Sequence, residues 1–169
     1  MYKRKSTLLK LDEVIEKHQQ LIIMHCADYG LSNVLNDSPL IIHTISTIQK
    51  RKWFKKVTLT VQTITLLTNQ AFLNFIIDEK GIEKMISVLL RNLHSIKEYK
   101  PITIGNKTVE DSGFHLQAVF NGLGWTDART KMGSYFLAIE KGELYEMVKN
   151  KVNANAFKGI VEKTNSYTK

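Results

Sequence analysis

NFIIDEKGIEKMISVLLRNL, residues 74–93, is the stretch on which the fold prediction depends. After Gly81, apolar residues recur three or four positions apart along one helical face, from Ile82 and Met85 to Leu93. Glycine readily adopts the left-handed conformation that ends a helix, so Gly81 is suited to a cap. The stretch therefore predicts two short helices that meet at Gly81.

A related pattern, FLAIEKGELYEMV, occurs at residues 136–148, and a fainter one lies at residues 22–35. The two clearer copies share an apolar group, Glu-Lys-Gly, and a Met followed by Ile or Val. Units this small cannot bury their own apolar faces, so repeated copies have to stack on one another. We therefore predict an all-α fold, a short right-handed α-solenoid of about three irregular helical repeats. The alternative is a non-repetitive helical bundle whose helices end in Glu-Lys-Gly.

Residues 75–90 resemble the first and second helices of an armadillo repeat, and residues 64–69 resemble the end of that family's third helix. The resemblance implies an armadillo/HEAT-like domain that binds a partner through its third-helix surface. In that family an asparagine on this surface grips the backbone of an extended peptide. The resemblance assigns that role to Asn69, with Gln62 and Thr65 on the same surface.

The chain reads as a single helical domain over residues 1–169: a basic lead-in (1–10), helical repeats (11–152) and a C-terminal tail (153–169). We predict helices over 11–29, ended by Gly30, and over 31–35, 39–50, 57–69, 110–123, 128–141 and 143–152. Threonine alternates with apolar residues over 57–69, which on propensity also fits a strand. Pro101 and Gly105-Asn106 predict a loop or a small hairpin.

The formal net charge is +8, and the excess of basic residues lies at the two ends of the chain. Such an excess favours acidic partners: nucleic acid, acidic peptide or anionic lipid. A single cysteine, Cys26, fits a reducing compartment. No apolar run reaches the roughly 18 residues that a membrane span needs, so we expect no membrane insertion and a cytoplasmic or nuclear location.

The strongest candidate functional patch is a basic cluster around two aromatic residues, Lys50, Arg51, Lys52, Trp53, Phe54, Lys55 and Lys56. Basic side chains neutralise phosphates, and aromatic rings stack on bases. The alternative is that Trp53 and Phe54 anchor a turn in the core while the charges are solvated. The cluster also resembles a short nuclear-import signal.

Other motifs are weaker. Residues 117–138 fit a helix-turn-helix only loosely, and plain solenoid helices explain them better. His18 and His25 lie two helical turns apart, about 10.5 Å, which is too far to share one metal on that helix. We predict no catalytic residue, no metal site and no cofactor.

These observations predict a non-enzymatic scaffold or adaptor that binds a protein or an extended acidic peptide, with self-association possible. Its partner-binding residues would be Asn69, Gln62, Thr65, Lys50, Arg51, Lys52, Trp53, Lys55 and Lys56. The alternative is a small basic nucleic-acid-binding regulatory protein that uses the basic ends of the chain.

Overall fold

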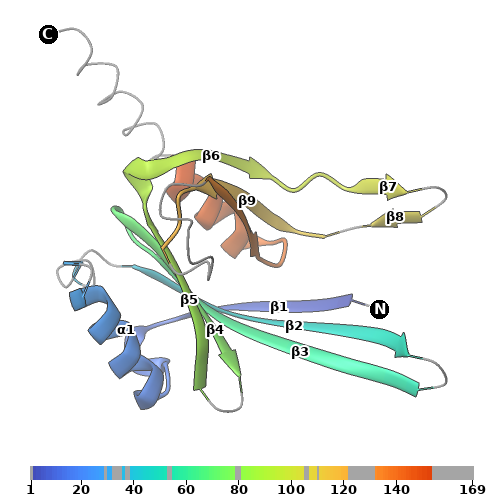
Figure 1. Ribbon diagram of the computed structural model, residues 1–169, viewed down its shortest axis with the longest axis horizontal. Coiled ribbons are helices and arrows are strands. Elements are labelled where there is room, and N and C mark those ends of the chain that lie inside the picture. The colour runs from blue at the N-terminus through green and yellow to red at the C-terminus, as the bar shows by residue number, and fades with distance from the viewer. Residues whose placement is uncertain are drawn as a thin grey trace, which may run out of the picture.

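The computed structural model describes residues 2–28, 30–31, 36, 39–52, 55–78, 81–104, 107–109, 111–121 and 132–153. Most of these residues lie in strands, which form a five-stranded sheet, a three-stranded sheet and a two-stranded ribbon (Figure 1). All the strand pairs are antiparallel. The predicted all-α, armadillo/HEAT-like solenoid over residues 11–152 is therefore wrong, and so is the helical repeat on which it rested.

The five-stranded sheet, called sheet A here, keeps its strands in chain order. They are β1 (Tyr2–Leu9), β2 (Leu40–Lys52), β3 (Lys55–Leu67), β4 (Ala71–Asp78) and β5 (Gly81–Leu89). A 3-10 helix, Leu11–Glu13, and helix α1, Glu16–Asp28, lie between β1 and β2 in the chain. The predicted basic lead-in thus contains an edge strand, and the predicted helices over 39–50 and 57–69 are the long strands β2 and β3.

Residues 74–78 and 81–89 form strands because both faces of β4 and β5 are covered; a 3-10 helix, Leu90–Asn92, follows β5. Asn74 pairs with Ile86, and Phe75 pairs with Met85. Ile86 packs toward the second sheet, whereas Phe75 packs toward α1. A strand that is buried on both faces reads as a nearly continuous apolar run, which periodicity cannot separate from a helix. Gly81 is the first residue of β5 and not a helix cap.

The three-stranded sheet, called sheet B here, has the order β10-β9-β6. Its strands are β6 (Leu93–Glu98), β9 (Gly113–Ala118) and β10 (Gly133–Ala138). Strands β9 and β10 occupy the segments predicted as helices over 110–123 and 128–141, so those helices are wrong. The loosely fitting helix-turn-helix is wrong for the same reason. Residues 122–131 lie outside the described residues. An isolated bridge joins Ser87 of β5 to Asn121, which follows β9 in the chain.

A small ribbon of β7 (Ile102–Ile104) and β8 (Lys107–Val109) lies between β6 and β9 in the chain. Of the two alternatives predicted around Pro101, a loop or a small hairpin, the structure has the hairpin. Figure 1 shows this ribbon and the β2–β3 hairpin projecting to the same side of the molecule.

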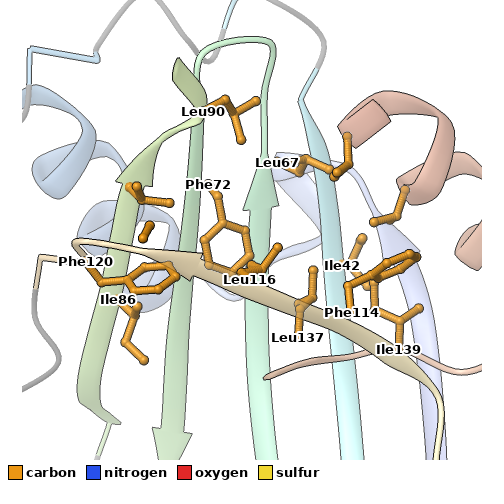
Figure 2. Packing of buried hydrophobic residues seen from close by; sticks show 14 of the residues in the cluster. Ile42, Leu67, Phe72, Ile86, Leu90, Phe114, Leu116, Phe120, Leu137 and Ile139 are labelled. Carbon is orange, nitrogen blue, oxygen red and sulfur yellow. The ribbon is translucent and has the colours of Figure 1, made fainter. Parts of the chain in front are cut away.

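The main hydrophobic core lies between the two sheets and is closed by a helix over residues 143–153. Phe72 and Ile86 of sheet A meet Leu116 and Leu137 of sheet B (Figure 2). The helix contributes Tyr145, Val148 and Val152 to the same cluster. The helix predicted over 143–152 is thus confirmed.

A second core lies on the other face of sheet A, beneath α1. Ile22 and Cys26 of the helix pack with Ile64, Leu73 and Phe75 of the sheet. The result is three layers: α1, sheet A, and sheet B with the C-terminal helix.

The single helix predicted over 11–29 begins too early, since α1 starts at Glu16 after the separate 3-10 helix, but its cap at Gly30 is confirmed. Gly30 has a φ of 67°, and its amide donates to the Ala27 carbonyl at 2.9 Å. The Leu31 amide donates to the Cys26 carbonyl at 2.6 Å. These two bonds form a Schellman cap, which satisfies carbonyls at the helix end. Of the short helix predicted over 31–35, residues 32–35 lie outside the described residues. Within the part of the chain that the structure describes, no helix has the length and apolarity to cross a membrane.

Candidate functional site

The β2–β3 hairpin extends beyond its neighbours in sheet A. Strand β1 begins opposite Ile48, and the pairing of β3 with β4 ends at Gln62. Four further pairs, Gln49–Thr58 to Lys52–Lys55, continue as a two-stranded ribbon. We call residues 49–52 and 55–58 the basic arm (Figure 1).

The basic arm contains the cluster that the sequence singles out. The register pairs Lys52 with Lys55, Arg51 with Lys56, and Lys50 with Val57. Five basic residues therefore occupy the last three pairs of the hairpin. Trp53 and Phe54 lie outside the described residues, so their predicted stacking or anchoring role stays a prediction.

Strand β1 adds two more lysines at the base of the arm. Lys3 pairs with Thr47, and Lys5 pairs with Ile45. Both lysines are exposed. The positive charge of the N-terminal segment and that of the β2–β3 hairpin, separated by about 45 residues of chain, thus lie on neighbouring strands.

Arg4 joins this base to sheet B. Its guanidinium forms an ion pair with Asp111 and donates to the Ser112 carbonyl at 2.5 Å. Its Nε donates to Ser46 Oγ at 3.2 Å. The Arg4 side chain is only 5% exposed and that of Asp111 is 23% exposed, so water screens the pair weakly. The same guanidinium lies 5.8 Å from the centre of the Phe136 ring.

Phe136 belongs to a cluster of three rings on the outer face of sheet B. Phe136 pairs with His115 across β10 and β9, and Tyr99 follows directly after β6. The ring centres are 5.0 Å apart for His115 and Phe136, 5.7 Å for Tyr99 and Phe136, and 5.9 Å for Tyr99 and His115. All three side chains are partly exposed. We call Tyr99, His115 and Phe136 the aromatic cluster.

The strand alternation explains why these rings point away from the core. Phe114 and Leu116 of β9, and Leu137 of β10, belong to the core between the sheets. Successive strand residues point to opposite faces, so His115 and Phe136 lie on the other face. Lys97 pairs with His115 in the same cross-strand row and is exposed.

The next row on this face is polar. Ser95 pairs with Gln117, and the Ser95 hydroxyl donates to Gln117 Oε1 at 2.7 Å. Ser134 pairs with Gln117 from the other side and is exposed. The outer face of sheet B therefore presents rings, a lysine and hydrogen-bonding groups side by side.

Two acidic side chains near the ends of these strands form ion pairs, and one of them, Glu98, lies on the core-facing side because it pairs with Phe114. A third, Glu140, accepts a bond from the Ser6 amide at 3.1 Å. Glu98 contacts Lys149 at 2.7 Å and accepts a bond from the Tyr145 hydroxyl at 3.2 Å. The hydrogen bond from Lys149 holds the pKa of Glu98 below its usual value. Asp111 is paired with Arg4. In the described part of the chain, Lys97 and Lys100 form no ion pair.

The residues expected to line a solenoid groove do not share one surface. Thr65 is buried and donates to Asn74 Oδ1 at 2.7 Å. Gln62 is exposed on the opposite face of β3, 3.1 Å from the ring of His43. Asn69 is exposed between β3 and β4. Their common third-helix surface does not exist, since β3 is a strand.

Sequence reasoning misses the aromatic cluster. Its signal is the alternation of apolar and polar residues in Gly113–Ala118, which is typical of a strand with one buried face. Because residues 110–123 are expected to form a helix, this strand pattern is not used in the prediction. Among the described residues, no group of three or more His, Cys, Asp or Glu side chains is placed to hold a metal ion.

No protein-family model, no curated protein and no solved structure matches the chain.

Proposed function

We propose that this protein binds nucleic acid, with the basic arm and strand β1 contacting the phosphate backbone. The observation that carries the proposal is the register of β1, β2 and β3, which brings Lys3 and Lys5 beside an arm with five basic residues. The proposal is for a binding protein without catalytic activity, acting in the cytoplasm or nucleus.

Electrostatics supports a polyanionic partner. The net charge is +8, and contacts between lysine or arginine and phosphate release counterions, which supplies much of the affinity of such complexes. A narrow two-stranded ribbon also follows a phosphate backbone or a groove more easily than a broad sheet does.

The test is a binding titration of labelled single- and double-stranded oligonucleotides at several salt concentrations. One variant changes Lys50, Arg51, Lys52, Lys55 and Lys56 to Thr, which keeps strand propensity. The wild type should bind with a steep salt dependence. On a single strand, the slope of log K against log salt should fall by about 0.7 for each phosphate that the variant no longer neutralises, up to about 3.5 for five.

A matched control removes the same charge elsewhere, at Lys10, Lys17, Lys84, Arg91 and Lys151. Both variants have a net charge of +3, since five positive charges are removed from +8. If the two variants weaken binding equally, the effect belongs to net charge and not to the arm. If polyglutamate competes as well as an oligonucleotide of equal length and charge, the partner is an acidic peptide. If the folded wild type binds no oligonucleotide at low salt, the proposal fails.

A further inference from the structure

We infer that the aromatic cluster on sheet B stacks unpaired bases, so that the nucleic acid this protein binds is single-stranded. This inference rests on the proposed function and adds a second contact surface to it. Tyr99, His115 and Phe136 would contact bases, while the basic arm contacts phosphates.

The arrangement of the rings supports base stacking. His115 and Phe136 are neighbours across two strands, and Tyr99 lies within 6 Å of both ring centres. Flat rings on an open sheet face are a common platform for bases, because every base has a π face whatever its identity. In the described part of the chain, the C-terminal helix packs on the opposite, core-facing side of this sheet.

The surroundings of the rings suit a polyanion. Lys97 lies in the same row as His115 and Phe136, and Lys100 follows Tyr99 directly. Arg4 lies over Phe136 and is itself paired with the carboxylate of Asp111. An apolar protein partner would have to desolvate these lysines, whereas a phosphate backbone would neutralise them.

The aromatic cluster is tied to the base of the basic arm by Arg4, whose side chain is only 5% exposed. Arg4 pairs with Ser46 on β2, at the base of the arm, while its guanidinium contacts Phe136 and Asp111. In this proposal one strand of nucleic acid would run from the arm onto the sheet. The bases of a duplex are paired and stacked inside the helix, so they offer no free face to these rings.

The polar row beside the rings offers hydrogen bonds to a stacked base. Ser95 holds Oε1 of Gln117, which orients the Gln117 amide group on this face. Ser134 lies beside it and is exposed. Such groups bond to the Watson–Crick edge of an unpaired base.

The experiment measures binding of a labelled oligothymidylate and of a duplex of matched length to ring-removal and ring-keeping variants. Phe136→Leu and Tyr99→Leu each remove one ring, whereas Phe136→Tyr and Tyr99→Phe keep it. Each ring removal should weaken binding of the single strand by about 5- to 150-fold. The ring-keeping variants should bind the single strand like wild type, and duplex binding should not change.

Photo-cross-linking provides a readout that does not depend on how well the variants fold. Wild-type protein is irradiated with a 5-iodouracil-substituted single strand, and the cross-linked peptides are identified by mass spectrometry. We expect adducts on Tyr99, His115 or Phe136. Adducts confined to other segments would overturn the stacking inference.

The outcomes separate this inference from the proposed function. If the leucine variants bind the single strand as tightly as wild type while the arm variant binds weakly, stacking is wrong and the proposed function stands. Preference for the duplex over the single strand in the wild type would also overturn the inference. If neither form binds the wild type, the proposed function fails and the inference fails with it.

Discussion

At the scale of single residues, Gly113 decides how β9 enters sheet B. Its φ is 150°, in a region that side chains with a Cβ rarely adopt. A Cβ at this position would lie 2.1 Å from the Leu137 carbonyl oxygen and 3.0 Å from Cζ of Phe136. The absence of a side chain at Gly113 is therefore what lets β10 pair closely and the Phe136 ring lie over the start of β9.

Gly113→Ala should destabilise the fold more than Gly142→Ala. Gly142 has nearly the same φ, 151°, but no atom lies within 4 Å of its Cβ position. Both substitutions incur backbone strain of about 1–3 kcal/mol. Only Gly113→Ala adds a clash with the backbone. This clash should lower the free energy of unfolding of the Gly113→Ala variant by about a further 1–3 kcal/mol. Denaturant unfolding of the two variants measures the difference, and equal losses would contradict this account.

At the scale of elements, a buried polar network ties β10 to β3 and β4. The Thr65 hydroxyl donates to Asn74 Oδ1, and Asn74 Nδ2 donates to the Tyr135 hydroxyl, both at 2.7 Å. Thr65 and Asn74 are almost fully buried. Buried polar groups are costly unless they are paired, so these bonds favour one alignment of the two sheets.

Tyr135→Phe should destabilise the protein by about 1–3 kcal/mol, because it leaves the buried Asn74 amide without its acceptor. Chemical unfolding at neutral pH measures this loss. Tyr135→Leu would also remove ring contacts with Phe72 and Phe120, so the phenylalanine variant is the cleaner test. An unchanged free energy of unfolding would show that the network does not hold the sheets together.

The same tyrosine predicts a loss of stability at alkaline pH. Burial raises the pKa of Tyr135 to about 12, whereas the unfolded chain ionises near 10. The unfolded state therefore loses its proton first, and stability falls as pH rises from about 10 towards 12. At pH 11 the contribution lost should be about 1.4 kcal/mol. The free energy of unfolding of wild type and of Tyr135→Phe, measured at pH 8 and at pH 11, isolates this contribution. If the stability difference between the two proteins is the same at both pH values, the prediction is wrong.

At the scale of the whole molecule, the Arg4–Asp111 pair connects the first strand of sheet A to the segment that leads into β9. The two partners are 107 residues apart in the chain. Asp111 Oδ1 also accepts a bond from the Ser112 amide at 2.7 Å, so the carboxylate is held in place. The pair therefore links the base of the basic arm to the aromatic cluster.

A double-mutant cycle with Arg4→Met and Asp111→Asn should give a coupling energy of about 1–3 kcal/mol. Breaking a poorly solvated pair leaves the remaining charge without its partner. The stability losses of the two single variants should therefore add up to more than the loss of the double variant. The exposed Glu98–Lys149 pair, with side chains 45% and 34% exposed, is the control and should show a smaller coupling. Additive losses at Arg4 and Asp111 would show that the two sheets are not coupled through this pair.

Several features of this protein are readable from the sequence alone. The Gly30 cap of helix α1, the interruption after Pro101 and the helix near the C-terminus are predicted correctly because each carries a local signal: a glycine, a proline or a helical apolar stripe. The basic cluster at residues 50–56 is also evident, since charge is a property of composition.

Strands β4 and β5 cannot be recognised from the sequence because their environment is set by distant parts of the chain. Sheet A is covered by α1 on one face and by sheet B on the other, so β4 and β5 carry apolar residues on both faces and lose the alternation that marks a strand. In β3, where threonine does alternate with apolar residues, the strand signal is present, but the expected repeat favours a helix there and is wrong.

The sequence by itself therefore determined the charge, the helix ends and the turns, which depend on neighbouring residues. Only the tertiary structure decided that Lys3 and Lys5 lie beside the basic arm, and that Tyr99, His115 and Phe136 form one cluster. Antiparallel pairing joins residues that are far apart in the chain, and its register depends on which faces are buried. Both candidate contact surfaces arise from that pairing.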